Sequence, residues 1–137
     1  MKLMNQAVHY AIQSLLYFAQ EPGKVVSART LSVALKMHRP FLRKVLQILG
    51  THKILKPLKG QNGGFVLNVN PNKLPILKVV HIFGVRLNLV DCIFQRRFCA
   101  QATSCTLRKS LMRIEGTLRN ELRKVTLATL RKNMHSV

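Results

Sequence analysis

Two short helices joined by a tight break are the feature that most constrains the fold of this 137-residue chain. Ser27 is a favourable N-cap for a helix over residues 28–36, and Pro40 suits the first turn of a second helix over residues 40–49. Gly50 is placed to end the second helix. This arrangement predicts a helix-turn-helix, whose second helix enters the major groove of DNA.

A Gly-rich turn follows the second of these helices. The stretch KGQNGG separates two short β-prone runs, residues 54–58 and 65–69, and therefore predicts a hairpin. A hairpin directly after a recognition helix is the wing of a winged helix. A phosphate-binding P-loop does not fit this stretch, because the Gly-Lys-Ser/Thr ending of that motif is missing.

Further helices are expected on both sides of this motif. Apolar residues share one arc at helical spacing over residues 5–20, and a mostly apolar helix is expected over residues 76–83. A long helix is expected over residues 106–124, with a final short turn, residues 127–131, capped by Thr126. The long helix has an apolar stripe that consists of Leu107, Leu111, Ile114, Leu118, Leu122 and Val125. We expect this stripe to pack against a second copy in a two-fold dimer; packing against its own domain is the alternative.

The predicted fold class is mainly α with a small β-hairpin wing: a winged helix-turn-helix domain followed by a long C-terminal dimerisation helix. We expect the DNA-binding domain over residues 1–84, a cysteine-containing loop over 85–105, and the dimerisation helix with its tail over 106–137. Residues 85–104 lack clear periodicity. A loop of this length is uncommon in a compact domain unless something such as a bound metal organises it.

The charge of the chain is extreme for its length. It has 23 Lys and Arg against 4 Asp and Glu, which gives a formal net charge of +19. Such a surface favours a polyanion, with strong salt dependence, and nucleic acid is the partner that we expect. A basic RNA-binding protein, such as a ribosome-associated factor, is the alternative function with the same charge.

Other classes of function fit the sequence less well. It has no paired-carboxylate site, nucleophile motif or cofactor fingerprint, so we do not expect an enzyme. It has no run of about 18 apolar residues that could span a membrane. The N-terminal residues lack the apolar core and cleavage site of a signal peptide. We therefore expect a cytoplasmic protein without a membrane partner.

The candidate DNA contacts lie on the second helix of the motif and on the hairpin turn. The outward face of the helix supplies Arg39, Arg43, Lys44 and Gln47. The turn supplies Lys59, Gln61 and Asn62. Arg reads guanine and Gln reads adenine through paired hydrogen bonds, whereas Lys more often positions a protein on phosphates. A merely solvated charged face is the alternative, but the density of cations beside a wing favours DNA contact.

Three cysteines, Cys92, Cys99 and Cys105, fall in one short stretch with the spacing C-x6-C-x5-C. An odd number argues against a framework of disulfides. Soft, anionic thiolates suit an iron–sulfur cluster or a zinc ion, and reduced thiols or a thiol switch are the alternatives. Three thiols are one ligand short of a closed four-coordinate site, so the fourth ligand must come from elsewhere.

Over nearly its whole length the chain resembles the winged-helix iron–sulfur regulators that include IscR and NsrR, with details closer to the NsrR branch. The shared features, in order, are MKLMNQAVHYAIQSLLYFA, the helix-turn-helix, KGQNGGF, LVDC, the cysteine spacing, CTLRKSL and VTLATL. The resemblance implies a homodimeric regulator, expected to be a repressor, that binds a near-palindromic site in double-stranded promoter DNA. A 2Fe–2S or 4Fe–4S cluster that senses nitric oxide, redox or iron status would control its affinity. A zinc- or thiol-based regulator with the same fold is the alternative.

The resemblance assigns the three cysteines as cluster ligands, and three other positions depart from the family pattern. Arg108 stands where IscR-like proteins have a histidine, and it cannot be a ligand. His9 stands where NsrR-like proteins can use an aspartate that reaches across the dimer, so His9 of the second subunit is the expected fourth ligand. Asp91 is the next candidate, as the acid nearest the thiols. Arg43 stands where the family often has Glu, which changes the expected DNA target.

Overall fold

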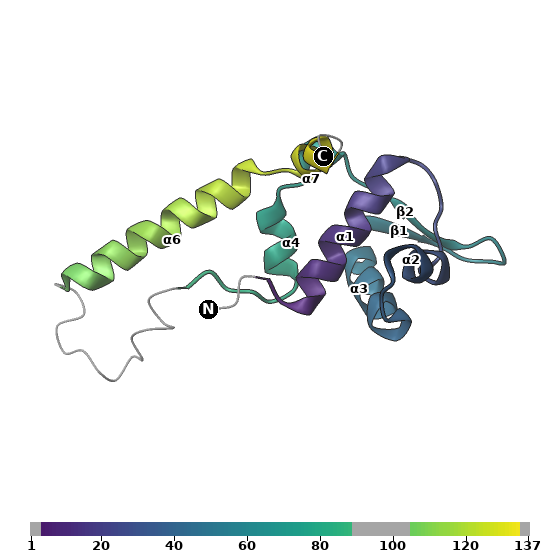
Figure 1. The fold of residues 1–137 in the computed structure, drawn as a ribbon, viewed down its shortest axis with the longest axis horizontal. Coiled ribbons are helices and arrows are strands. Elements are labelled where there is room, and N and C mark those ends of the chain that lie inside the picture. The colour runs from purple at the N-terminus through teal and green to yellow at the C-terminus, as the bar shows by residue number, and fades with distance from the viewer. Residues whose placement is uncertain (1–3, 89–104, 135–137) are drawn as a thin grey trace.

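The computed structural model describes residues 4–88 and 105–134 of the chain (Figure 1). Within these ranges it is a winged helix-turn-helix followed by a long helix, as the sequence predicts. The elements are α1 (Gln6–Gln20), α2 (Ala28–Leu35), α3 (Arg39–Thr51), β1 (Leu55–Leu58), β2 (Gly64–Leu67), the 3-10 helix η1 (Pro71–Lys73), α4 (Ile76–Ile82), α6 (Thr106–Lys124) and α7 (Leu127–Met134). We call α1 to α4, the hairpin and α7 the head, and α6 the arm.

The first two helices begin where short polar side chains cap them, whereas α3 has no side-chain cap and has Pro40 in its first turn. The Asn5 side-chain oxygen accepts a hydrogen bond from the Val8 amide at 2.8 Å, and the Ser27 hydroxyl accepts one from the Thr30 amide at 3.1 Å. The prediction that Ser27 caps α2 is therefore confirmed. Large apolar side chains from the three helices meet in one core, and those that are almost fully enclosed include Leu15, Phe18, Leu31, Leu42, Leu46 and Leu49.

The end of α3 differs from the prediction. Gly50 was expected to end the helix, but α3 continues through Gly50 to Thr51. The chain leaves the helix at Lys53, which adopts a left-handed conformation with φ of 61°. Gly50 faces the hairpin instead, because a side chain added there would contact Phe65 and Pro57. Gly50 therefore lies inside the helix next to the hairpin and does not end α3.

The hairpin joins the helix-turn-helix through a third backbone segment. β1 and β2 pair antiparallel, with Leu55 opposite Leu67. Val26 adds a bridge to Phe65, with both backbone N···O distances at 2.9 Å. Gly64 passes so close to Val26 that a Cβ on Gly64 would overlap the Val26 carbonyl oxygen. The wing is thus fixed directly beside the N-terminus of α2.

The C-terminal helix α7 returns to the head and packs against α1. The Leu127 amide donates to the Leu74 carbonyl at 2.9 Å, and the Ile76 amide donates to the Val125 carbonyl at 2.9 Å. Leu127 is fully enclosed in the core. The predicted final turn is therefore a longer helix that closes the head.

The arm extends away from the head (Figure 1) and has no buried residue along its length. Its C-terminal half packs on its own head through Leu118 and Leu122. Its N-terminal half does not, and Leu107 and Ile114 are 54 % and 55 % exposed. The apolar stripe is therefore partly used within the chain and partly left open. Among the described residues, no helix has the length and apolarity that a bilayer crossing requires.

Candidate functional site

A groove lies between the N-terminus of α2, the outward face of α3 and the hairpin. Arg39, Arg43 and Gln47 line it from α3, and Lys59 lines it from the hairpin turn. Residues four apart lie on one face of a helix, so the three α3 side chains follow one another along the groove. The structure thus brings together four of the side chains that the sequence predicts as DNA contacts.

The other three predicted contacts do not line this groove. Lys44 is exposed on α3, but it is turned about 100° from Arg43 around the helix axis. Gln61 and Asn62 are exposed in the turn that joins the two strands. The Gly63 amide donates to the Gly60 carbonyl at 3.0 Å, which closes this turn. These residues lie around the groove, where DNA contacts would be peripheral.

Three polar residues line the groove that sequence reasoning did not assign to DNA: Ser27, Arg29 and Thr51. Thr51 lies four residues beyond Gln47 on the same face, and its hydroxyl donates to the Gln47 carbonyl at 3.0 Å. Thr51 was missed from the sequence because the predicted helix ended before Gly50. Arg29 reaches the groove because the wing docks beside the N-terminus of α2, a contact between segments that are far apart in the sequence.

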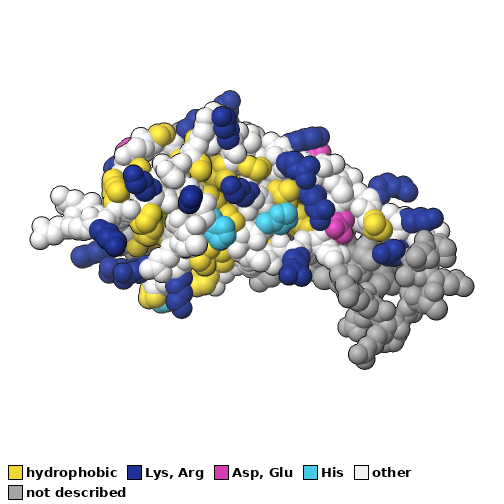
Figure 2. Space-filling view, turned by 180° about the vertical axis from the view of Figure 1, so that it is seen from behind, with side chains coloured by type: hydrophobic (Ala, Val, Ile, Leu, Met, Phe, Trp, Pro, Cys, Tyr) yellow, Lys and Arg dark blue, Asp and Glu magenta, His cyan; other side chains and the backbone are white. Residues whose placement is uncertain are grey.

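The groove is strongly cationic. Four of its lining residues are Lys or Arg, and none is acidic. Glu21 is the single acidic residue in the first 84 positions. It pairs with Lys24 at 3.0 Å outside the groove, and its hydrogen bond and charge raise the pKa of Lys24. Lys and Arg side chains also outnumber acidic ones on the face in Figure 2. Such a field attracts a polyanion.

Of the predicted cluster ligands, the structure describes Cys105 and His9. Cys92, Cys99 and Asp91 lie outside the described residues. Cys105 is the N-cap of α6; its half-buried thiol is free and makes no capping hydrogen bond. Within the described residues, no group of three or more His, Cys, Asp or Glu is placed to hold a metal ion.

His9 is exposed near the beginning of α1, with its ring 6.4 Å from that of Tyr10. The beginning of α6, where Cys105 lies, is at the outer end of the arm and far from α1 (Figure 1). A single described chain therefore does not bring His9 and Cys105 together.

Comparison with known proteins identifies the family. The chain matches the Rrf2 family model, an iron-dependent transcriptional regulator, over residues 4–133. It is 27 % identical over 139 residues to the regulator NsrR of Bacillus subtilis, covering 100 % of this chain and 94 % of that protein. It is 30 % identical over 114 residues to NsrR of Shouchella clausii, covering 82 % of this chain and 72 % of the relative.

Solved structures agree in fold. CymR, the global cysteine regulator of B. subtilis, aligns with a TM-score of 0.81 at 16 % identity, covering 97 % of this chain and 98 % of CymR. T. potens IscR aligns with a TM-score of 0.75 at 18 % identity, covering 98 % of this chain and 88 % of IscR. The curated relatives are transcription regulators rather than enzymes. This chain therefore belongs to the Rrf2 family of winged-helix transcription regulators, which bind DNA.

Proposed function

We propose that this regulator acts in the cytoplasm as a homodimeric repressor whose affinity for promoter DNA is controlled by an iron–sulfur cluster. One observation carries the proposal. The match to an iron-dependent regulator family spans residues 4–133 and so includes all three cysteines, the third of which begins the arm with a free thiol. A DNA-binding head and a segment with three candidate metal ligands would thereby be combined in one chain.

The groove is the proposed DNA interface. Arg39, Arg43 and Gln47 would read base edges in the major groove, where Arg recognises guanine and Gln recognises adenine. Lys59 and Arg29 would contact phosphates on either side, which fixes the register of α3. The peripheral residues from the sequence analysis would add backbone contacts: Lys44, Gln61 and Asn62. Duplex DNA, rather than RNA, fits a single protruding helix flanked by a wing.

The N-terminal half of the arm is the proposed dimer interface. Leu107 and Ile114 are more than half exposed, and a two-fold partner would cover them. Residues 1–84 would then bind DNA, 85–105 would hold the cluster and 106–137 would include the dimerisation helix. Two α3 helices spaced about 34 Å apart would read a near-palindromic site across one turn of DNA.

The chemistry of Cys105 fits the cluster. Its thiol is free and half-buried, and it stands at a helix N-terminus, where the backbone amides favour negative charge. With Cys92 and Cys99 it would hold a 2Fe–2S or 4Fe–4S cluster, which supplies reactivity towards nitric oxide, oxygen or changes in iron supply. The partner subunit's His9 is the proposed fourth ligand, because His9 and Cys105 are far apart within one chain. Ligation across the dimer would hold each head at a fixed angle to the arm.

The experiment is an anaerobic purification followed by metal analysis. The wild-type protein should be brown and contain iron and acid-labile sulfide in stoichiometric amounts. Alanine at position 92, 99 or 105 should abolish both, whereas His9→Ala should retain iron with an altered absorbance spectrum and faster cluster loss. Colourless protein with one zinc per chain, or with three free thiols and no metal, would contradict the cluster. Preferential binding to RNA over duplex DNA would contradict the proposed target.

A further inference from the structure

The recognition helix α3 begins without a side-chain cap of its own. The turn before it closes locally on the side of α2: Lys36 takes a left-handed conformation with φ of 54°, and the Met37 amide donates to the Ser32 carbonyl at 3.0 Å. His38, the N-cap of α3, makes no side-chain capping hydrogen bond. Because the first amides of a helix have no partner inside it, a cap usually secures this end. Within the turn, no side chain does so for α3.

Tyr10 of α1 makes two contacts at this end of α3. Its hydroxyl oxygen accepts a hydrogen bond from the His38 amide at 3.1 Å. Its ring meets the ring of Phe41 edge-on, with the centroids 5.0 Å apart and the planes at 81°. Aromatic pairs favour this arrangement. His38 is the N-cap and Phe41 lies in the first turn, so the two contacts hold one helical turn at both of its ends.

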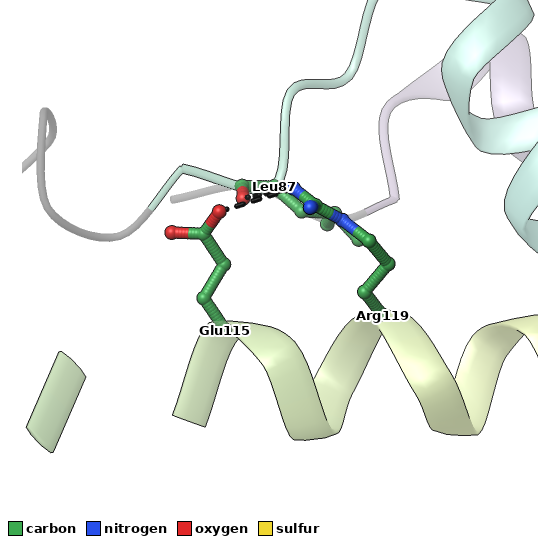
Figure 3. A network of polar contacts seen from close by, with 3 residues as sticks. All are labelled: Leu87, Glu115 and Arg119. Carbon is green, nitrogen blue, oxygen red and sulfur yellow. Dashed lines mark hydrogen bonds and ion pairs between the residues drawn. The ribbon is translucent and has the colours of Figure 1, made fainter. Parts of the chain in front are cut away.

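Other side-chain contacts between distant segments hold different parts of the fold. Arg119 donates to the Leu87 carbonyl at 3.5 Å and joins the arm to the chain that follows α4 (Figure 3). Arg131 donates to the Ala19 carbonyl at 3.0 Å and joins α7 to α1. Of these three contacts, the one made by Tyr10 reaches the recognition helix. Its effect is therefore expected in the groove rather than in the joining of the arm to the head.

The turn that Tyr10 holds carries the first of the groove residues. Arg39 is the first residue of α3 and lines the groove, whereas Gln47 lines it about 12 Å further along the helix axis. The segment before Gln47 is fixed in the core, because Leu46 is fully enclosed. Release of the first turn would therefore displace Arg39 and leave Gln47 in place.

We propose that Tyr10 is a positioning residue for base recognition, which fixes the first turn of α3 so that Arg39 is aligned with its base. Tyr10 does not line the groove, so it acts through the helix and not on the DNA. A bidentate contact between arginine and guanine needs two aligned hydrogen bonds, which a displaced helix end would lose. The proposal rests on the groove as the DNA interface, so one measurement uses DNA-free protein and another uses DNA.

The first measurement is amide hydrogen exchange in DNA-free protein, followed by NMR. Tyr10→Phe removes the hydroxyl oxygen and keeps the ring on Phe41. Exchange at the His38 amide should become at least about fivefold faster, because its acceptor is lost. Tyr17→Phe is the matched control: it removes the same atom near the other end of α1, beside Lys24, and should leave this exchange unchanged. Wild-type exchange at His38 in Tyr10→Phe would overturn the proposal.

The second measurement compares affinities for a duplex, selected from a random library with wild-type protein, and for its single-base variants at one fixed salt concentration. Arg39→Ala and Gln47→Ala first locate the base pair that each side chain reads, as the position where discrimination is lost. Tyr10→Phe should then lower discrimination about fivefold at the base pair of Arg39 and leave it unchanged at that of Gln47. Tyr17→Phe should match wild type at both. A general loss of folding would affect both positions equally.

A double-mutant cycle tests whether Tyr10 acts through Arg39. Tyr10→Phe should have little further effect on affinity in an Arg39→Ala background, and its full effect in a Gln47→Ala background. Full effects in both backgrounds, or equal losses of discrimination at both base pairs, would overturn the positioning role while the interface stands. If Arg39→Ala and Gln47→Ala both keep wild-type discrimination, the proposed interface fails, and the role of Tyr10 in base recognition fails with it.

Discussion

The head and the arm differ in how completely one chain can pack them. The head encloses leucines from several helices almost fully, and its groove is lined entirely by residues of one chain. The arm has no buried residue, and its outer half leaves large apolar side chains exposed. A single chain therefore suffices to form the groove of the head, but it leaves part of the apolar stripe of the arm uncovered.

From this difference we infer where regulation would act. The groove is built from packed helices and a wing bridged to Val26, so we expect a signal to act on the placement of the heads rather than on the shape of the groove. In the proposed dimer the arms would set the relation between the two heads, and the third cysteine stands at the N-terminal end of the arm. A signal received there would change the spacing or angle of two preformed heads, to which binding at two half-sites is sensitive.

Substitutions in the exposed apolar stripe of the arm should have the largest effect on DNA affinity. Leu107→Arg with Ile114→Arg places two cations in the exposed part of the stripe, where the proposed dimer buries them. We expect a monomer in analytical ultracentrifugation and an affinity for a two-half-site duplex that is lower by about 100-fold or more, because the avidity of paired heads is lost. Circular dichroism should show an intact fold, since neither side chain is buried.

Met112→Arg is the matched control for this variant. Met112 is 53 % exposed on the same helix, but it lies about 130° around the axis from the centre of the stripe at 100° per residue. The Met112→Arg variant should remain dimeric and bind the same duplex with unchanged affinity. A double stripe variant that still sediments as a dimer would place the interface elsewhere.

Substitutions in the groove should have the next largest effect. Arg43→Ala removes a side chain that lines the groove, and a lost bidentate base contact of about 1–3 kcal/mol corresponds to roughly 5- to 150-fold in affinity. Discrimination among bases at one position should relax as well. Fluorescence anisotropy with a labelled operator and single-base variants measures both.

Lys44→Ala removes the same charge from the next position, outside the groove lining. It should weaken binding only about threefold and equally for all sequences, as expected for a phosphate contact. An equal loss of base discrimination in both variants would contradict the geometry of α3.

A substitution in the closely packed turn of the wing should have a smaller effect, which falls on the stability of the fold. A Cβ at position 63 would overlap the Leu58 carbonyl oxygen, so Gly63→Ala must displace the turn. We expect a loss of about 1–3 kcal/mol in the free energy of unfolding, the usual range for a packing clash. Urea denaturation followed by circular dichroism measures the change. An unchanged midpoint would show that the wing accommodates the methyl group.

A glycine-to-alanine substitution in the arm should change the free energy of unfolding in the opposite direction. A Cβ at position 116 meets no atom within 4 Å, and Gly116 lies inside α6. Gly116→Ala should therefore raise the free energy of unfolding by about 0.5–1 kcal/mol, because alanine loses less conformational freedom in a helix. A lower melting temperature would contradict the open packing of the arm at this position.

Local signals in the sequence predict most of the helices. The predicted bounds of α6 agree with the structure, because its apolar spacing and following break are properties of neighbouring residues. Ser27 was identified as a cap for the same reason. The turn KGQNGG predicted the hairpin because glycine is required where Gly63 approaches Leu58.

Contacts between distant segments could not be read in the same way. The return of α7 to α1 depends on backbone pairing of Val125 and Leu127 with residues on either side of Pro75, and no local pattern encodes it. The position of Arg29 in the groove depends on the bridge between Val26 and Phe65. The apolar stripe predicted a buried face on α6. Only the fold shows that Leu118 and Leu122 pack on the head, whereas Leu107 and Ile114 stay exposed. The boundaries at residues 84 and 105 stay predictions.

In the proposed mechanism, chemistry at the cysteine end of the arm controls DNA binding by the head. The direct measurement is the affinity of iron-loaded wild type, metal-free wild type and Cys105→Ala for one duplex, at one fixed salt concentration. The duplex would be selected from a random library with the loaded protein under anaerobic conditions. The account predicts that the loaded protein differs at least about tenfold from the other two, which should agree with each other, as expected for a coupling free energy of 1–3 kcal/mol. Three equal affinities would contradict it.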